Sequence, residues 1–200
     1  MTFEHLIIFN IALLAALASP GPAFLVMIRT TLNAGRTAGI ALGFGLGSVA
    51  AMWTLMALLG LDTVFKIFPW AYTAVKIIGA VYLLYIAFKM WRSANDVLET
   101  ETKPSNRAFL QGVLINLLNP KSVLFAAAVL VVIFPKGMTF AENATVVLNH
   151  LIVELMFYTA MAIGMSTKTV SAFYIRLKKY IDRVSSVVLG ALGIRLLTQN

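Results

Sequence analysis

Apolar residues run along the chain in stretches of about 20 residues, and short charged stretches separate them. An α-helix of about 20 residues rises about 30 Å, which matches the hydrocarbon thickness of a bilayer. The pattern therefore predicts an all-α, polytopic membrane protein with six transmembrane helices. We expect the spans at about 3–28, 38–61, 67–90, 109–134, 144–167 and 184–199.

The first and sixth spans are less regular than the others. Ala16-Leu17-Ala18 in the first span resembles a signal-peptide cleavage site. Residues 1–5 hold no lysine or arginine, however, and apolar sequence follows directly, which favours a retained span. The sixth span is short and carries Arg195, whose side chain can extend to the membrane interface.

The basic residues predict how the chain is oriented. The connections after spans one, three and five hold eleven lysines and arginines, whereas Lys66, Lys136 and Arg195 lie toward the other side. Cytoplasmic connections carry this excess in membrane proteins, so we expect a multi-pass protein with both termini outside the cytoplasm. The eleven residues are Arg29, Arg36, Lys89, Arg92, Lys103, Arg107, Lys168, Arg176, Lys178, Lys179 and Arg183.

Two proline motifs interrupt the first and fourth spans. They are Ser19-Pro20-Gly21-Pro22 and Asn119-Pro120-Lys121. Proline removes a backbone donor and disfavours helix in the preceding residue, so we expect both spans to be broken there. Each broken span would begin a three-span half, and because three is odd the second half would be inserted inverted. We therefore predict one transporter domain over 1–200 with halves at about 1–91 and 109–200, joined by a cytoplasmic connection over 92–108.

Matching breaks in two inverted halves point to the binding site of a transporter, because unpaired backbone groups there can face a solute. The alternative is that the prolines only bend helices for packing.

Polar side chains also fall at membrane depth. Lys76 lies near the centre of span three and Glu154 near the centre of span five. His150 and Tyr158 are spaced four residues on either side of Glu154, so all three share one helix face. A charge at this depth is normally paired or faces water, which allows a proton relay at Glu154 or an inert Lys76–Glu154 pair. Lys121 either contacts a carboxylate or extends to the interface.

Gly39, Gly43 and Gly47 form a row in span two with the spacing GxxxGxxxG. Such a row lets another helix approach closely, which predicts packing within the chain. A homodimer through the same row is the second possibility.

Composition excludes several classes of function. Hydrophobic residues make up 60% of the chain and charged residues 12%, too few for a soluble domain. The net charge of +8 resides at the ends of apolar runs, so we expect no nucleic-acid partner. There is no cysteine and there are two histidines, which argues against a metal site. No phosphate-binding loop or hydrolase motif occurs, so we expect neither an enzyme nor a cofactor.

Short motifs are distributed along nearly the whole chain, namely Pro20-Gly21-Pro22, Gly35-Arg36, Ala38-Gly39, KIIGAVYLL over 76–84, Phe109 with Gly112, Asn116 with Asn119-Pro120-Lys121, IDRV over 181–184 and GIRLL over 193–197. With these motifs the sequence resembles the LysE/RhtB family of bacterial inner-membrane amino-acid exporters. The segment over 134–143 and the pair Ser185-Ser186 depart from the family pattern.

The resemblance implies an exporter of a small amino acid or an analogue, driven by the proton-motive force across the bacterial inner membrane. An acidic residue in span five is common in the family, and Glu154 has a comparable place. We expect protons to be carried by Glu154, His150 and Tyr158. A passive channel or facilitator and a non-transporting membrane scaffold remain alternatives. The residues expected to bind the substrate are Ser19, Pro20, Gly21, Pro22, Lys76, Asn116, Asn119, Pro120 and Lys121.

Overall fold

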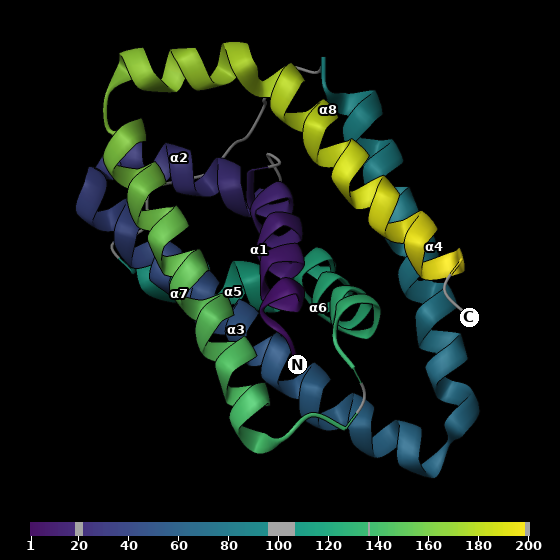
Figure 1. Cartoon of the computed structure of the whole chain (residues 1–200). Helices are drawn as coiled ribbons and strands as arrows, with labels where there is room; N and C mark the ends of the chain where they lie inside the picture. Colours follow the sequence, from purple (N-terminus) through teal and green to yellow (C-terminus); the bar gives the residue numbers. More distant parts are fainter. Residues whose placement is uncertain (19–21, 96–106, 136, 199–200) are drawn as a thin grey trace.

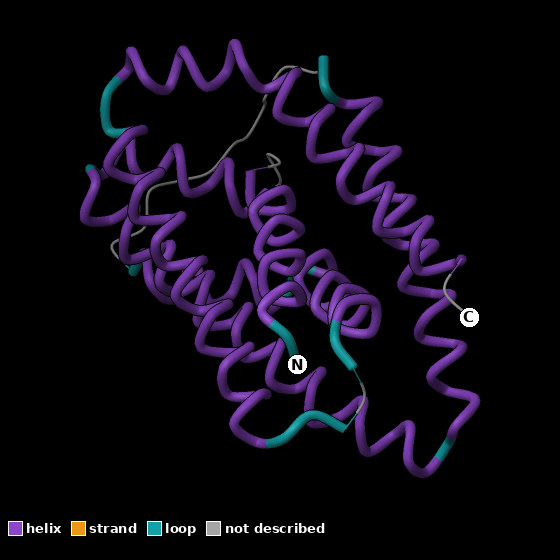
Figure 2. The backbone as a smooth tube through the Cα atoms, in the orientation of Figure 1, coloured by secondary structure: helices purple, strands orange, loops and turns teal. Residues whose placement is uncertain are grey.

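A computed structural model describes residues 1–18, 22–95, 107–135 and 137–198. Across these residues every regular element is an α-helix (Figures 1 and 2). The predicted all-α fold class is therefore confirmed for these residues. The helices are α1 (Phe3–Ala18), α2 (Pro22–Ala34), α3 (Arg36–Ile67), α4 (Pro69–Ser93), α5 (Ala108–Leu117), α6 (Pro120–Ile133), α7 (Phe140–Met165) and α8 (Lys168–Thr198).

The chain bends sharply between α1 and α2 and again between α5 and α6, by 61° in each case. At the second bend Pro120 is the first residue of α6, and Asn119 caps that helix by accepting a 3.0 Å hydrogen bond from the backbone N–H of Lys121. Proline is favoured at this position because its missing N–H has no partner there in any case. Ser19, Pro20 and Gly21 of the first motif lie outside the described residues.

Two helices of the described chain are long and apolar enough to cross a membrane, namely α7 and the part of α3 over Arg36–Gly60. Each bent pair reaches the same length and apolarity when it is taken as one span, which makes up to four candidate spans among the described residues. Helices α4 and α8, which correspond to the third and sixth predicted spans, are not among them. The prediction of six spans in two inverted halves therefore stays a prediction.

Helix α8 differs from the sequence prediction. A connection was expected over 168–183, but one helix continues from Lys168 to Thr198 and turns in direction along its length (Figure 1). No proline or glycine occurs between Lys168 and Leu189, so nothing in this stretch ends the helix. Its second part runs along α4, where the Ser186 hydroxyl donates a 2.6 Å hydrogen bond to the Ala87 carbonyl.

Helices α3 and α7 pack closely through the predicted glycine row. A Cβ atom added to Gly43 would lie 2.4 Å from Cβ of Tyr158, and one added to Gly47 would lie 3.2 Å from Cβ of Glu154. Only glycine permits such an approach, which confirms the packing interpretation of the row. Dimerisation through this face would require the contact between α3 and α7 to open.

A second pair of glycines brings α5 against the opposite side of α3. A Cβ atom on Gly45 would lie 2.1 Å from the Phe109 carbonyl oxygen, and one on Gly112 would lie 2.1 Å from the Leu42 carbonyl oxygen. Helix α3 is therefore held between α5 and α7 at backbone distance.

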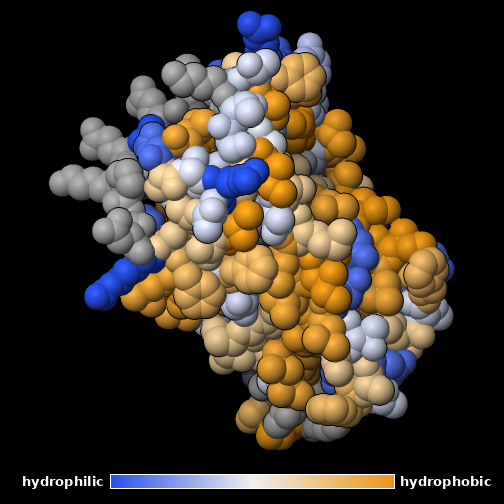
Figure 3. Space-filling model, turned by 90° about the vertical axis from the view of Figure 1, so that its left-hand side faces the viewer, coloured by the Kyte–Doolittle hydropathy of each residue, from blue (hydrophilic) through white to orange (hydrophobic). Residues whose placement is uncertain are grey.

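The polarity of α7 is inverted relative to a helix of a soluble protein. Its buried face carries His150, Glu154 and Tyr158, whereas large apolar side chains such as Ile152 and Met156 point outward. Outward-facing apolar side chains suit a lipid environment. Figure 3 shows the same character on one face of the whole molecule, where hydrophobic residues cover a broad area.

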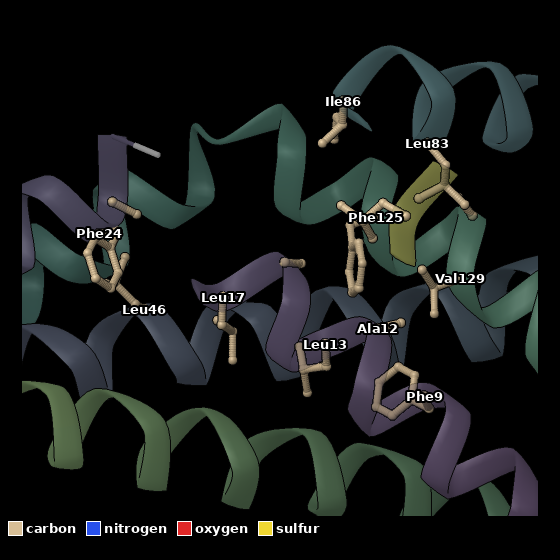
Figure 4. Packing of buried hydrophobic residues seen from close by; sticks show 14 of the residues in the cluster. Phe9, Ala12, Leu13, Leu17, Phe24, Leu46, Leu83, Ile86, Phe125 and Val129 are labelled. Atoms are coloured by element: carbon tan, nitrogen blue, oxygen red, sulfur yellow. The ribbon is translucent and has the colours of Figure 1, made fainter. Parts of the chain in front are cut away.

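The buried core forms around α1, the first helix of the first bent pair. Phe9 and Leu13 of α1 belong to one cluster with Phe125 and Val129 of α6 and Leu83 of α4 (Figure 4). Because α1 and α6 are both parts of bent pairs, this cluster fixes the two bends relative to each other.

Candidate functional site

A cavity of about 60 Å³ lies where the two bent pairs change direction. Since one water molecule needs about 10–15 Å³ measured in this way, the cavity has room for several water-sized groups. Leu13, Leu17, Phe24 and Phe125 form its apolar walls. Its polar lining includes Asn116, Asn119, Lys121, His150, Glu154 and Tyr158.

One wall of the cavity is the polar face of α7, extended by a residue of α3. His150 Nε2 lies 3.2 Å from Glu154 Oε1, and His150 Nδ1 lies 2.6 Å from Thr54 Oγ1. A carboxylate oxygen only accepts, so with Glu154 ionised Nε2 donates and Nδ1 accepts the Thr54 hydroxyl proton. All three side chains are buried. Phe9 packs edge-on against the imidazole at 5.5 Å, which holds the ring in this orientation.

Another wall of the cavity carries a cation at the N-terminal end of α6. Lys121 Nζ donates a 3.1 Å hydrogen bond to the Ala16 carbonyl, and the Tyr174 hydroxyl donates one of 2.8 Å to the Ala18 carbonyl. These carbonyls belong to the last turn of α1, where no intrahelical donor remains. The N-terminus of α6, with its own partial positive charge, lies at the same wall. The cavity thus has an electropositive part, at Lys121 and the start of α6, in addition to the Glu154 carboxylate.

Asn116 tethers the end of α5 to α3. Its side-chain Nδ2 donates to the Leu46 carbonyl, and its Oδ1 has no hydrogen-bond partner in the described part of the chain. Oε2 of Glu154 likewise has no partner.

Six of the predicted site residues therefore meet in one cavity, although they come from two separate stretches of the sequence. Asn116, Asn119 and Lys121 arrive from the bend between α5 and α6, and His150, Glu154 and Tyr158 arrive from α7.

The remaining predicted site residues cannot be placed in the same way. Ser19, Pro20 and Gly21 lie outside the described residues, as do the side chains of Pro22, Lys76 and Pro120. The described part of the cavity lining includes no residue of α4, the helix that carries Lys76.

Two polar residues of the site are absent from the sequence prediction. Thr54 contacts His150 from α3, and Ser122 lines the cavity one residue beyond Lys121. Thr54 is a polar residue within the apolar stretch of span two, and this position at membrane depth is visible in the sequence. Across the described residues no group of three or more metal-ligating side chains occurs.

Comparison with known proteins identifies the chain's relatives. It is 26% identical over 191 residues to the threonine efflux protein of Escherichia coli (strain K12), covering 92% of this chain and 93% of the relative. It is 28% identical over 166 residues to the homoserine/homoserine lactone efflux protein of Salmonella typhimurium, covering 81% of each chain. No solved structure matches. The family model of the LysE type translocator matches residues 14–200, as the sequence motifs predict, and the chain belongs to this family.

Proposed function

We propose that the protein exports a small amino acid, or an analogue of one, across the bacterial inner membrane. The observation that carries the proposal is a single cavity that presents both an ammonium group, on Lys121, and a carboxylate, on Glu154. A zwitterion complements that pair of charges, because each of its ends meets the opposite sign. The relatives are named for the efflux of threonine and of homoserine, both small amino acids.

In the proposed site the substrate lies between the two bends, near the middle of the membrane. Lys121 has two N–H groups beyond the one given to Ala16, and with the N-terminus of α6 it would attract a carboxylate. The predicted contributions of Ser19-Pro20-Gly21-Pro22, Lys76 and Pro120 belong to the same proposal.

Export would be coupled to proton entry through α7. Glu154 and His150 share a hydrogen bond within the cavity wall, so a proton taken up by one can pass to the other. Tyr158 lies one turn further along the same buried face. Entry of a proton would discharge Glu154 and weaken its hold on a positively charged ligand.

The two bent pairs would begin inverted three-span halves, with both termini outside the cytoplasm. The excess of basic residues on the opposite connections supports this orientation. A cysteine introduced at Thr2, in a chain that has none, should then react with an impermeant maleimide in intact cells. Reaction only after the cells are permeabilised would reverse the orientation.

The test of the proposed function is efflux from proteoliposomes loaded with a labelled panel of amino acids, including threonine. We expect efflux of one or a few of them that accelerates when a proton gradient is imposed. Efflux that is indifferent to the gradient would make the protein a facilitator. Folded protein that releases no amino acid would contradict the proposal and favour a scaffold.

We expect Thr54→Val to slow gradient-driven efflux about tenfold, because it leaves Nδ1 of His150 buried without a partner, at a cost of about 1–3 kcal/mol. Gradient-independent exchange of the same amino acid should change little, and Thr54→Ser, which keeps the hydroxyl, should restore the parent rate. An equal loss in both assays would reduce Thr54 to a packing role.

A further inference from the structure

Two buried oxygen atoms in the cavity wall have no hydrogen-bond partner among the described residues. They are Oε2 of Glu154, in a residue 4% exposed, and Oδ1 of Asn116, in a residue 3% exposed. The orientation of the Asn116 amide follows from its donation to the Leu46 carbonyl, because only the nitrogen end can donate. Both atoms are therefore acceptors, and both residues line the cavity.

The two acceptors lie beside the same turn of α3. The Asn116 amide is bonded to Leu46, and a Cβ atom added to the next residue, Gly47, would lie 3.5 Å from Glu154 Oε2. Because Gly47 has no side chain, α7 packs directly against α3 beside the carboxylate. This corner of the cavity, where both side chains meet α3 at neighbouring residues, is lined by the two acceptors.

A buried acceptor without a donor is costly, and the cost is greater for a charged one. The group that best satisfies two acceptors lining one cavity, one of them anionic, is a cation with several N–H donors. A primary ammonium has three such donors and a charge opposite to that of Glu154. A carboxylate or an acyl group would instead bring further acceptors to the same corner.

We propose that this corner, formed by Glu154 and Asn116 beside Gly47, is a subsite for the primary ammonium group of the transported solute. The inference rests on the proposed function and assigns its substrate a direction, with the ammonium toward α7 and the carboxylate toward Lys121. Selection then acts on the amine, so an N-acetylated amino acid is excluded, whereas a primary amine without a carboxylate still binds.

Two fragments of threonine separate the ends of the site. 1-Aminopropan-2-ol is threonine without its carboxylate, and 3-hydroxybutyrate is threonine without its ammonium. Binding to purified protein in detergent is measured as ligand-dependent thermal stabilisation, which requires no transport step. In the parent protein we expect stabilisation by threonine and by each of the two fragments, and none by N-acetylthreonine.

Each variant changes either the ammonium end or the carboxylate end of the proposed site. Glu154→Gln should raise the half-saturating concentration of 1-aminopropan-2-ol about tenfold or more and leave that of 3-hydroxybutyrate unchanged. Lys121→Met should do the reverse. Asn116→Leu, which removes the second acceptor, should act in the same direction as Glu154→Gln and serves if that variant does not fold. Glu4→Gln, at an exposed position of α1, is the matched control and should change neither.

The outcomes separate the inference from the proposed function. If threonine is bound and exported by the parent but Glu154→Gln and Asn116→Leu leave the binding of 1-aminopropan-2-ol unchanged, the ammonium subsite is wrong and the exporter stands. The same conclusion follows if N-acetylthreonine binds as well as threonine. If the folded parent neither binds nor releases any amino acid of the panel, both are wrong.

Discussion

Glu154→Gln is expected to make amino-acid efflux indifferent to an imposed proton gradient. Glutamine keeps the size of the side chain and one oxygen that can accept a hydrogen bond from His150, but it does not take up a proton at the pH of a cell. Efflux from proteoliposomes should then run at the same rate with and without the gradient. Exchange of labelled for unlabelled amino acid at saturating concentration should persist, because that reaction needs no net proton movement.

Two comparisons make this result specific. Glu4→Gln removes a carboxylate from an exposed position of α1 and should retain the full response to the gradient. His150→Gln tests the other member of the pair and should reduce the response as well. A Glu154→Gln protein that still accelerates under the gradient would contradict proton coupling at this residue and direct attention to Lys76.

Gly43→Val is expected to remove most of the folded protein. The added Cβ atom alone would lie 2.4 Å from Cβ of Tyr158, and its nearest neighbours include the backbone Cα of the same residue at 3.7 Å. Separating α3 from α7 would open the contact that aligns His150 and Glu154. Overpacking of this kind costs about 1–3 kcal/mol and sometimes more, a large part of the stability of a domain.

The control for this variant lies in the same helix. A Cβ atom added to Gly60 has nothing within 4 Å, so Gly60→Val should be tolerated. Size-exclusion chromatography in detergent should show a monodisperse peak for Gly60→Val and aggregate or loss of expression for Gly43→Val. If both variants gave the same monodisperse peak, the packing of α3 on α7 would be wrong.

The sequence predicts those parts of the site that depend on local spacing. His150, Glu154 and Tyr158 share a face of α7 because residues four apart in a helix always do. The bend at Asn119-Pro120 is equally local, since proline and an asparagine cap specify where α6 begins. The glycine row of α3 likewise indicates close packing before its partner is known.

The partners across helices could not be predicted in the same way. Thr54 reaches His150 only because α3 and α7 pack in one particular register, and that register is a property of the whole fold. The sequence predicts that Lys121 either contacts a carboxylate or extends to the interface. In the structure Lys121 donates to the last turn of α1. The suggested Lys76–Glu154 pair stays a prediction, and the described partner of Glu154 is His150.

In the proposed mechanism the exported amino acid occupies the cavity between the two bends. Because the chain has no cysteine, a single cysteine at Ser122, in the cavity lining, reports directly on occupancy. A cysteine at Ser166, exposed between α7 and α8, is the matched control. A transported amino acid should slow maleimide labelling of Ser122→Cys at the concentrations that saturate its transport and leave Ser166→Cys unaffected. Labelling of Ser122→Cys that does not respond to a saturating transported amino acid would contradict this mechanism.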